Sequence, residues 1–222
     1  LTLLLNFPLL KLKKHIMKKV KAIVFFLAAI FCIQINIAFS QPSRISFEKY
    51  IDNGDTLRYR KLFPETNPRR KKPLVIFLPG SGERGNDNEA QLKWGVMNFA
   101  TDENMIRYPA LVIAPQCPEK TGWSNFSRSD MKLQTAPTKP MELLIGLIKK
   151  LIKTMPVDTN RIYITGLSMG GYGTYDAIER YPNLFAAAVP VCGGGDTSKV
   201  ASIAHLPMWI FLGAEDPAVN PI

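Results

Sequence analysis

A serine at a predicted sharp bend is the residue best placed to do covalent chemistry. Ser168 lies in the run Gly166-Leu167-Ser168-Met169-Gly170-Gly171, which directly follows the apolar, β-branched run Ile162-Tyr163-Ile164-Thr165. This is the G-x-S-x-G pattern of a nucleophile elbow, in which a strand turns sharply into a helix and exposes the hydroxyl. Because a serine hydroxyl is a weak nucleophile until a base removes its proton, the pattern predicts acyl transfer and requires partner residues. The alternative is a glycine-rich structural turn.

A second glycine-rich turn could stabilise the negative charge that acyl transfer creates. The apolar run 74–78 ends in Pro79-Gly80-Ser81-Gly82-Glu83-Arg84-Gly85. A tetrahedral oxyanion needs preorganised backbone N–H donors, one from such a turn and one from the residue after the nucleophile. We therefore assign the amides of Ser81 and Met169 to an oxyanion hole. The alternative, a phosphate cradle, is disfavoured because the turn lacks the Lys-Ser/Thr ending of a P-loop and the dinucleotide spacing.

The elements that must hold these two turns are those of a mostly parallel sheet with helices on both faces, an α/β fold. Short apolar runs ending in Gly, Pro or a polar turn predict buried strands at residues 74–78, 110–114, 161–165, 187–191 and 208–212. An Asn53-Gly54 turn predicts an N-terminal antiparallel hairpin of residues 46–50 and 56–61. A helical apolar stripe from Met141 to Ile152, before Pro156, indicates core packing, and further helices are predicted at 89–98, 169–180 and 198–205.

Composition and charge favour an ordinary globular protein over a nucleic-acid binder. The chain has 222 residues, 46% of them hydrophobic and 21% charged, which excludes a disordered or fibrous chain. Residues 1–40 hold six lysines and no acid, so the net charge of +10 falls to +4 over residues 41–222. Because no zinc spacing, RNA-binding motif or helix-turn-helix signal accompanies the remaining charge, we expect no nucleic-acid partner.

The basic N-terminal segment has the pattern of a secretory signal. Met17-Lys18-Lys19-Val20-Lys21 is a cationic n-region, residues 22–33 are an apolar h-region, and Ala38-Phe39-Ser40 suits cleavage before Gln41. The apolar stretch is short for a membrane span, and bulky Phe31 before Cys32 argues against a lipoprotein. We expect Met17 to be the true start, residues 1–40 to be upstream sequence plus signal peptide, and residues 41–222 to be one catalytic domain. The protein is then secreted or periplasmic, with no stable membrane anchor.

Four separated motifs together resemble the secreted α/β-hydrolase esterases. They are PLVIFLPGSGERG, APQCP with Trp123 shortly after it, the block RIYITGLSMGGYGTYDAIERYPNLFAAAVPVCGGGD, and LPMWIFLGAEDPAV. The group includes proteins labelled phospholipase/carboxylesterase, predicted peptidase and polyhydroxybutyrate-depolymerase-like, as well as feruloyl- and acetyl-ester hydrolases. The resemblance covers nearly all of residues 45–219. It implies the α/β-hydrolase fold and a Ser, Asp, His triad in that chain order.

The resemblance places the triad acid after the strand at 208–212, where Asp216 stands. An acid just past the carboxyl end of a parallel strand also lies at the same sheet edge as the elbow, where it can orient an imidazole. Asp196, which follows the CGGG run, is the alternative, and Asp216 is preferred on the family position. Asp176 and Glu215 are expected to be solvated or structural.

The histidine of the triad is absent from its expected place after the acid. The two histidines are His15, in the leader, and His205, which precedes the acid and is expected to be a surface or capping residue. We expect the catalytic histidine beyond residue 222, with the last strand and helix, and therefore a chain incomplete at its C-terminus with weak turnover and poor solubility. The alternative is real loss of the base. Pro79 and Leu212 also stand where relatives usually carry histidine.

The function that follows is hydrolysis of carboxylic esters, small or linked to a polymer such as polysaccharide, through an acyl-enzyme on Ser168. A serine peptidase of the same fold, or a catalytically dead binding protein, is the alternative. Trp123 is expected to line the substrate pocket or to lie in the core. No cofactor is expected, and no metal, because no cluster has metal-ligand spacing. If the strand order follows the family, about 14 Å separates the strands before Cys117 and Cys192, which favours free thiols.

Overall fold

The computed structural model describes Met17 and residues 44–64 and 70–219. The predicted signal segment after Met17, its cleavage before Gln41, Cys32 and His15 all lie outside the described residues. Among the described residues, no helix is both long enough and apolar enough to cross a bilayer.

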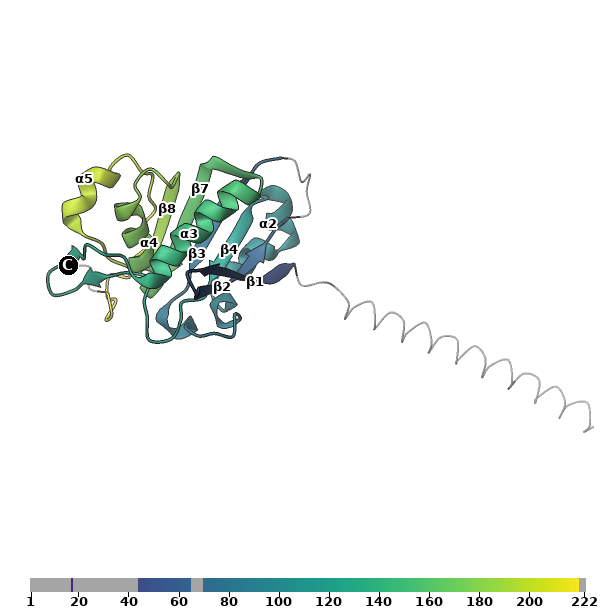
Figure 1. The fold of residues 1–222 in the computed structure, drawn as a ribbon, viewed down its shortest axis with the longest axis horizontal. Helices are drawn as coiled ribbons and strands as arrows, with labels where there is room; N and C mark the ends of the chain where they lie inside the picture. Colours follow the sequence, from purple (N-terminus) through teal and green to yellow (C-terminus); the bar gives the residue numbers. More distant parts are fainter. Residues whose placement is uncertain (1–16, 18–43, 65–69, 220–222) are drawn as a thin grey trace, which may run out of the picture. The chain divides into compact units, whose positions relative to one another are not determined.

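A six-stranded sheet forms the centre of residues 44–219, in the order β1-β2-β4-β3-β7-β8 (Figure 1). Strands β1 (Ile45–Asp52) and β2 (Asp55–Leu62) form an antiparallel hairpin, and β2 also pairs antiparallel with β4 (Leu111–Pro115). From β4 onward the strands are parallel: β3 (Lys72–Leu78), β7 (Val157–Leu167) and β8 (Ala187–Val191). The predicted hairpin and these four predicted strands are confirmed.

The hairpin turn forms because its two central residues tolerate a left-handed backbone. Asn53 and Gly54 have φ angles of 50° and 88°. Two such residues in succession match the right-handed twist of the flanking strands, which is why Asn-Gly is favoured there.

Helices cover both faces of the sheet, as predicted. One face packs against α3 (Lys139–Thr154) and α4 (Met169–Arg180) in the large core cluster. The other face carries a smaller cluster, in which Val75 and Val112 meet side chains of the 3₁₀ turns η2 (Ala90–Leu92) and η3 (Val96–Ala100) and of α2 (Asp102–Arg107). Strand β3 therefore lies between two packed layers, and α4 packs against β3, β7 and β8 on one face of the sheet, which fixes the strand ends that precede the glycine-rich turns.

The apolar stripe of α3 is core packing, as predicted. The Thr138 hydroxyl accepts a hydrogen bond from the Met141 amide at 3.3 Å and caps the helix, which ends before Pro156. Met141, Leu144 and Ile148 are fully buried. The apolar face of α3 therefore packs in the core of the same chain.

Two predicted elements were wrong in kind. Residues 89–98 form the short turns η2 and η3 in place of one helix, because Gly95 at φ 77° interrupts the helical backbone. Residues 208–212 form no regular strand: Met208 and Phe211 each make one isolated parallel bridge to β8. Their neighbours Trp209 and Ile210 stay exposed, so the segment lies alongside β8 without a second layer over it.

Other elements were shorter than predicted or were missed. Residues 198–205 contain only η4 (Thr197–Lys199) and the four-residue α5 (Val200–Ile203). Helix α2 and the small hairpin of β5 (Phe126–Ser127) and β6 (Lys132–Leu133) were not predicted from the sequence. Both are too short to produce a periodic pattern, and the hairpin is held mainly by contacts with distant residues.

Candidate active site

Ser168 occupies a strained bend between β7 and α4. Its φ and ψ angles are 56° and −115°, a backbone conformation that residues other than glycine rarely adopt. Two hydrogen bonds hold the bend: the Ser168 amide donates to the Val191 carbonyl at 2.9 Å, and the Tyr172 amide donates to the Ser168 carbonyl at 3.1 Å. Strain that the surroundings maintain in this way is typical of a nucleophile elbow.

The glycines on either side of Ser168 are required by close backbone approach. A Cβ on Gly166 would lie 2.3 Å from the Gly170 carbonyl oxygen, and one on Gly170 would lie 2.0 Å from the Leu78 carbonyl oxygen. The turn therefore folds back on itself and against the end of β3. No side chain fits at either position, which is the crowding that the G-x-S-x-G spacing relieves.

The end of β3 brings the second glycine-rich turn, residues 79–85, next to Ser168. A Cβ on Gly80 would stand 3.8 Å from the Ser168 Cβ. Ser81 begins the 3₁₀ turn η1 (Ser81–Glu83) and Met169 begins α4, so helix geometry gives neither amide an acceptor within its own helix. Both residues assigned to the oxyanion hole are thus first residues of helical turns beside Ser168.

Gln116, which the sequence analysis did not select, holds the oxyanion turn from β4. This side chain is 1% exposed, and its amide nitrogen donates to the Glu83 carbonyl at 3.3 Å and to the Asp87 carboxylate at 2.7 Å. Its amide oxygen accepts from the Asn88 N–H at 2.7 Å. A glutamine between two prolines and a cysteine carries no local signal of this role, because its partners are about 30 positions away in the chain.

Trp123 is fully buried, so the structure places it in the core, one of the two alternatives left open above. Its indole N–H donates to the Pro79 carbonyl at 3.2 Å, and a Cβ on Gly173 would lie 2.4 Å from its own Cβ. The ring thus packs on α4 and holds the predicted oxyanion turn, residues 79–85, through Pro79. It meets the turn from inside the protein, not from the substrate side.

Asp216 lies just past the bridged segment beside β8. Its Oδ1 accepts hydrogen bonds from the amides of Val219 and Ala218, at 3.0 and 2.9 Å, and these bonds hold the pKa of Asp216 below its usual range. The Cys192 thiol is a neighbour of this carboxylate, and burial together with the nearby charge raises the pKa of that thiol. Cys192 directly follows Val191, whose carbonyl binds the Ser168 amide, so Asp216 is at the same sheet edge as Ser168.

Asp196, the alternative acid, is buried and its oxygens are already used. The amide and hydroxyl of Ser198 donate to Oδ1, and the Leu133 amide donates to Oδ2 at 3.0 Å. These bonds lower the pKa of Asp196, the Ser198 hydroxyl most of all. The carboxylate caps η4 and fastens β6, which is a structural role.

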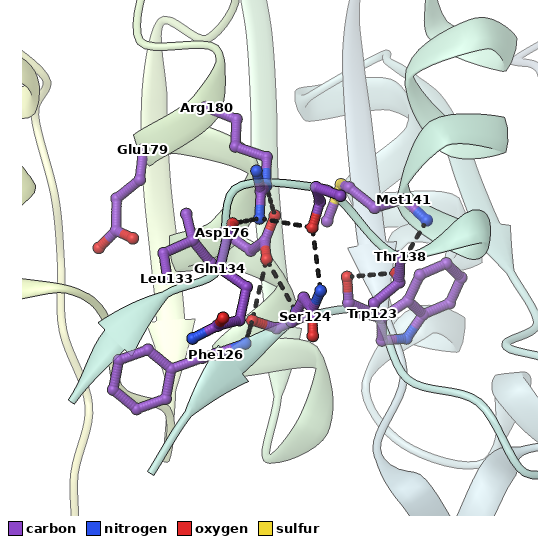
Figure 2. Close-up of polar contacts among 12 residues, drawn as sticks. Trp123, Ser124, Phe126, Leu133, Gln134, Thr138, Met141, Asp176, Glu179 and Arg180 are labelled. Atoms are coloured by element: carbon purple, nitrogen blue, oxygen red, sulfur yellow. Dashed lines mark hydrogen bonds and ion pairs between the residues drawn. The ribbon is translucent and has the colours of Figure 1, made fainter. Parts of the chain in front are cut away.

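Asp176 is also structural, because it fastens the segment between Trp123 and Thr138 to α4 (Figure 2). Its carboxylate accepts from the Ser124 hydroxyl at 3.0 Å, from the Asn125 amide at 3.1 Å and from the Arg180 guanidinium at 2.7 Å. The other guanidinium nitrogens of Arg180 donate to backbone carbonyls of residues 134–136. One buried ion pair on α4 thus ties both ends of this segment.

The β5–β6 hairpin of this segment lies close to the start of α4. The Phe126 ring is 5.7 Å from the Tyr172 ring, and the Arg128 guanidinium stands 5.0 Å from the centre of the same ring. Tyr172 is one helical turn after Ser168. The hairpin therefore covers the first turn of the nucleophile helix.

His205 sits at the far end of α4. Its Nε2 is 3.2 Å from the carbonyl oxygen of Pro182, just past the last residue of the helix. The His205 side chain is exposed. The helix has 12 residues, so about 18 Å separates that end from Ser168. His205 is the sole histidine in the part of the chain that the structure describes, and that part brings no imidazole to Ser168.

The remaining candidates are the metal-ligating residue types, the two cysteines and Glu215. Within residues 44–64 and 70–219, no three His, Cys, Asp or Glu side chains are grouped so as to hold a metal ion. Cys117 and Cys192 are free thiols, as the sequence favoured, and β3 and β7 lie between the strands that precede them. Glu215 is exposed.

Comparisons with known proteins agree with this fold. Residues 134–218 match the Prolyl oligopeptidase family. A solved structure titled as a thermostable esterase superposes with a TM-score of 0.75 at 44% identity, over 80% of this chain and 48% of that one. The chain therefore has the α/β-hydrolase fold.

Two curated relatives also match. The bifunctional acetylxylan esterase/xylanase XynS20E of Neocallimastix patriciarum is 28% identical over 161 residues, which is 72% of this chain and 21% of the relative. Poly(3-hydroxyalkanoate) depolymerase C of Paucimonas lemoignei is 39% identical over 142 residues, 64% of this chain and 32% of the relative. The chain thus spans a fifth to a third of the length of these relatives.

Proposed function

We propose that this chain, a member of the α/β-hydrolase esterase family, hydrolyses carboxylic esters through an acyl-enzyme formed on Ser168. One observation carries the proposal: a serine is held at φ 56° at a strand-to-helix bend, so close to the turn after β3 that a Cβ on Gly80 would lie 3.8 Å from the Ser168 Cβ. That strain has no structural use that a glycine would not serve better. A serine at this position is explained if its hydroxyl attacks a bound substrate.

In the proposed reaction, the Ser168 oxygen attacks the ester carbonyl carbon while a base takes its proton. The carbonyl π electrons move to oxygen, and the amides of Ser81 and Met169 donate hydrogen bonds to the resulting oxyanion. The oxyanion collapses, the C–O bond breaks, and the alcohol leaves with the proton from the base. Water then repeats the sequence on the acyl-enzyme and releases the acid and free Ser168. The N-terminus of α4 favours the negative charge at each stage.

Asp216 is the proposed acid of the triad. Its pKa is depressed, so it is ionised at neutral pH and can orient an imidazole and stabilise its protonated form. Asp196 is less suited, because three hydrogen bonds from Ser198 and Leu133 already occupy its carboxylate. The imidazole itself has to follow the acid in the chain order of this fold.

The proposed substrates are extracellular esters that are small or attached to a polymer. The names of the two curated relatives include an acetylxylan ester and a polyhydroxyalkanoate, both of them polymer esters. The cationic and apolar pattern of residues 17–40 supports export of the protein.

A serine peptidase is the second candidate, since residues 134–218 match the Prolyl oligopeptidase family. The same nucleophile and oxyanion donors can act on amides. Assays with p-nitrophenyl acetate, peptide p-nitroanilides and a fluorophosphonate probe separate the two candidates. We expect labelling of Ser168, none in Ser168→Ala, and a kcat/KM for the ester at least about a hundredfold above that for the peptides. Peptide cleavage with little ester hydrolysis would identify a peptidase.

Imidazole in solution tests the requirement for a base. Fluorophosphonate labelling of Ser168 should increase with added imidazole, while Ser168→Ala stays unlabelled at every concentration. Ser168 that resists the probe at all imidazole concentrations would contradict catalysis and favour a binding protein.

A further inference from the structure

Trp94 is an exposed aromatic side chain whose edge is fixed inside the protein. The residue is 52% exposed, yet its indole N–H donates to the Glu83 carboxylate at 3.0 Å, and Glu83 is buried. The backbone is fixed as well: Gly95, at φ 77°, lies so close to β3 that a Cβ there would be 3.2 Å from the Phe77 ring. An exposed tryptophan usually loses side-chain entropy when it binds a ligand, and this one has already lost much of it.

The anchor of Trp94 also belongs to the oxyanion turn. A Cβ on Gly80 would lie 2.9 Å from Glu83 Oε2 and 3.8 Å from the Ser168 Cβ. The Glu83 carboxylate therefore stands between the indole edge and the turn beside the nucleophile. A ligand stacked on the indole would be a neighbour of an ester bound at Ser168.

The surroundings of the ring suit a polar ligand with one apolar face. The Lys93 ammonium stands over one face of the ring, 4.9 Å from its centre, and about half of the side chain is exposed to water. The chain thus offers a flat apolar surface with an N–H donor beside it. A pyranose ring matches this surface, because its C–H face can stack while its hydroxyls stay hydrated or accept hydrogen bonds. An aryl acyl group would instead favour an enclosed apolar pocket.

We propose that Trp94, oriented by Glu83, is a sugar-binding platform that holds the carbohydrate part of an esterified oligosaccharide next to Ser168. This inference rests on the proposed esterase function and specifies its substrate as a sugar ester. Trp94 contacts the sugar, and Glu83 is a positioning residue that acts through the indole.

Binding of unesterified xylotetraose, measured by isothermal titration calorimetry, tests the platform without any catalysis. We expect saturable binding to the full chain, at least about tenfold weaker in Trp94→Ala. Trp209→Ala is the matched control, since Trp209 is 69% exposed but lies in the segment beside β8. Its affinity should stay within about twofold of the unmodified chain. No binding by the unmodified chain, or equal weakening by both variants, would overturn the proposal.

Hydrolysis gives a second readout. The ratio of kcat/KM for acetylated xylotetraose to that for p-nitrophenyl acetate should fall about tenfold in Trp94→Ala, through a higher KM for the sugar ester, and stay constant in Trp209→Ala. A loss confined to aryl acyl esters would contradict the sugar platform and leave the esterase function standing. Sugar binding through Trp94 without any ester hydrolysis would support the platform and contradict the esterase function.

Glu83 is tested through the same binding measurement. Glu83→Gln keeps an oxygen that can accept the indole N–H, whereas Glu83→Ala removes it. Weakened xylotetraose affinity in Glu83→Ala, with recovery in Glu83→Gln, is the expected result. Equal affinity in both variants would remove Glu83 from the proposal.

Discussion

On one side of Ser168, distant side chains hold the predicted oxyanion turn; they come from the residue after β4, from the link between η2 and η3, and from the segment after Cys117. On the other side, Asp216 is held by amides of its own turn. The first group contributes Gln116, Trp94 and Trp123. The second depends on Ala218 and Val219, within three residues of Asp216, and follows a segment that contacts β8 at two bridges.

This difference follows from what each side has to do. The proposed oxyanion donors are backbone amides that cannot adjust by changing rotamer, so their position depends on long-range packing of the turn. A carboxylate on a flexible side chain needs mainly to be ionised and within reach, and a local turn provides this. Substitutions on the oxyanion side should therefore lower stability and activity together, whereas substitutions at Asp216 should lower activity alone.

The two aspartates provide the sharpest test. In a protein that carries the expected triad histidine, Asp216→Ala should lower ester turnover about 10³-fold or more, because that histidine loses its orienting charge, and change stability by less than about 1 kcal/mol. Asp196→Ala should instead cost about 1–2 kcal/mol, because it removes the side-chain cap of η4 and the acceptor of three part-buried hydrogen bonds from Leu133 and Ser198. Kinetics and urea unfolding of both variants measure the two effects. The reverse pattern would make Asp196 the triad acid.

Gly170→Ala should produce the largest loss of stability. The new Cβ would stand 2.0 Å from the Leu78 carbonyl oxygen, so the elbow and the end of β3 must move apart. We expect a cost of about 3 kcal/mol or more, or failure to fold. Gly82→Ala is the control in the same turn region, since nothing lies within 4 Å of its Cβ position, and it should stay within about 1 kcal/mol of the unmodified chain. Similar urea midpoints for both variants would contradict the close packing.

Trp123→Phe tests the support beneath the oxyanion turn. It removes the N–H that binds the Pro79 carbonyl and leaves space against α4, which should cost about 2 kcal/mol. Because the turn carries the Ser81 amide, kcat for esters should fall about tenfold. A stability loss with unchanged kcat would show that Trp123 supports the fold without positioning the oxyanion donors.

The smallest expected effect concerns Glu179, which lies on α4 and binds the turn of Asp196. Burial raises its pKa to about 8, and its Oε1 accepts from the Asp196 amide at 2.8 Å. The folded state retains a proton that the unfolded state releases near pH 4.5, so stability should fall as pH rises from about 4.5 to 8. Glu179→Gln removes this titration. The variant should match the unmodified chain at pH 4 and exceed its stability by about 1–2 kcal/mol at pH 9.

Thermal unfolding of both forms at the two pH values measures this effect. Parallel pH profiles would show that Glu179 titrates normally.

Much of the sheet could be predicted because its signals are local. The run before Ser168 and the apolar runs of β3, β4 and β8 each carry their own strand pattern, and the Asn53-Gly54 turn has its own backbone preference. The segment at 208–212 has the same apolar pattern but forms only bridges. A regular strand needs hydrogen bonds to an adjacent strand and side chains packed over its faces, and the residues of the segment itself cannot supply either.

The sequence by itself determined the elbow, since G-x-S-x-G between a strand and a helix requires that bend wherever the chain folds. Only the tertiary structure decided the roles of the polar and aromatic residues around it. Asp196 and Asp216 both follow a glycine-containing run. The carboxylate of Asp196 accepts a hydrogen bond from Leu133, 63 positions earlier in the chain, whereas the hydrogen bonds of Asp216 come from its own turn. The Trp123 side chain is buried in the core, whereas the Trp94 side chain is exposed. Side-chain roles of this kind depend on contacts between residues far apart in the chain, and packing is what brings them together.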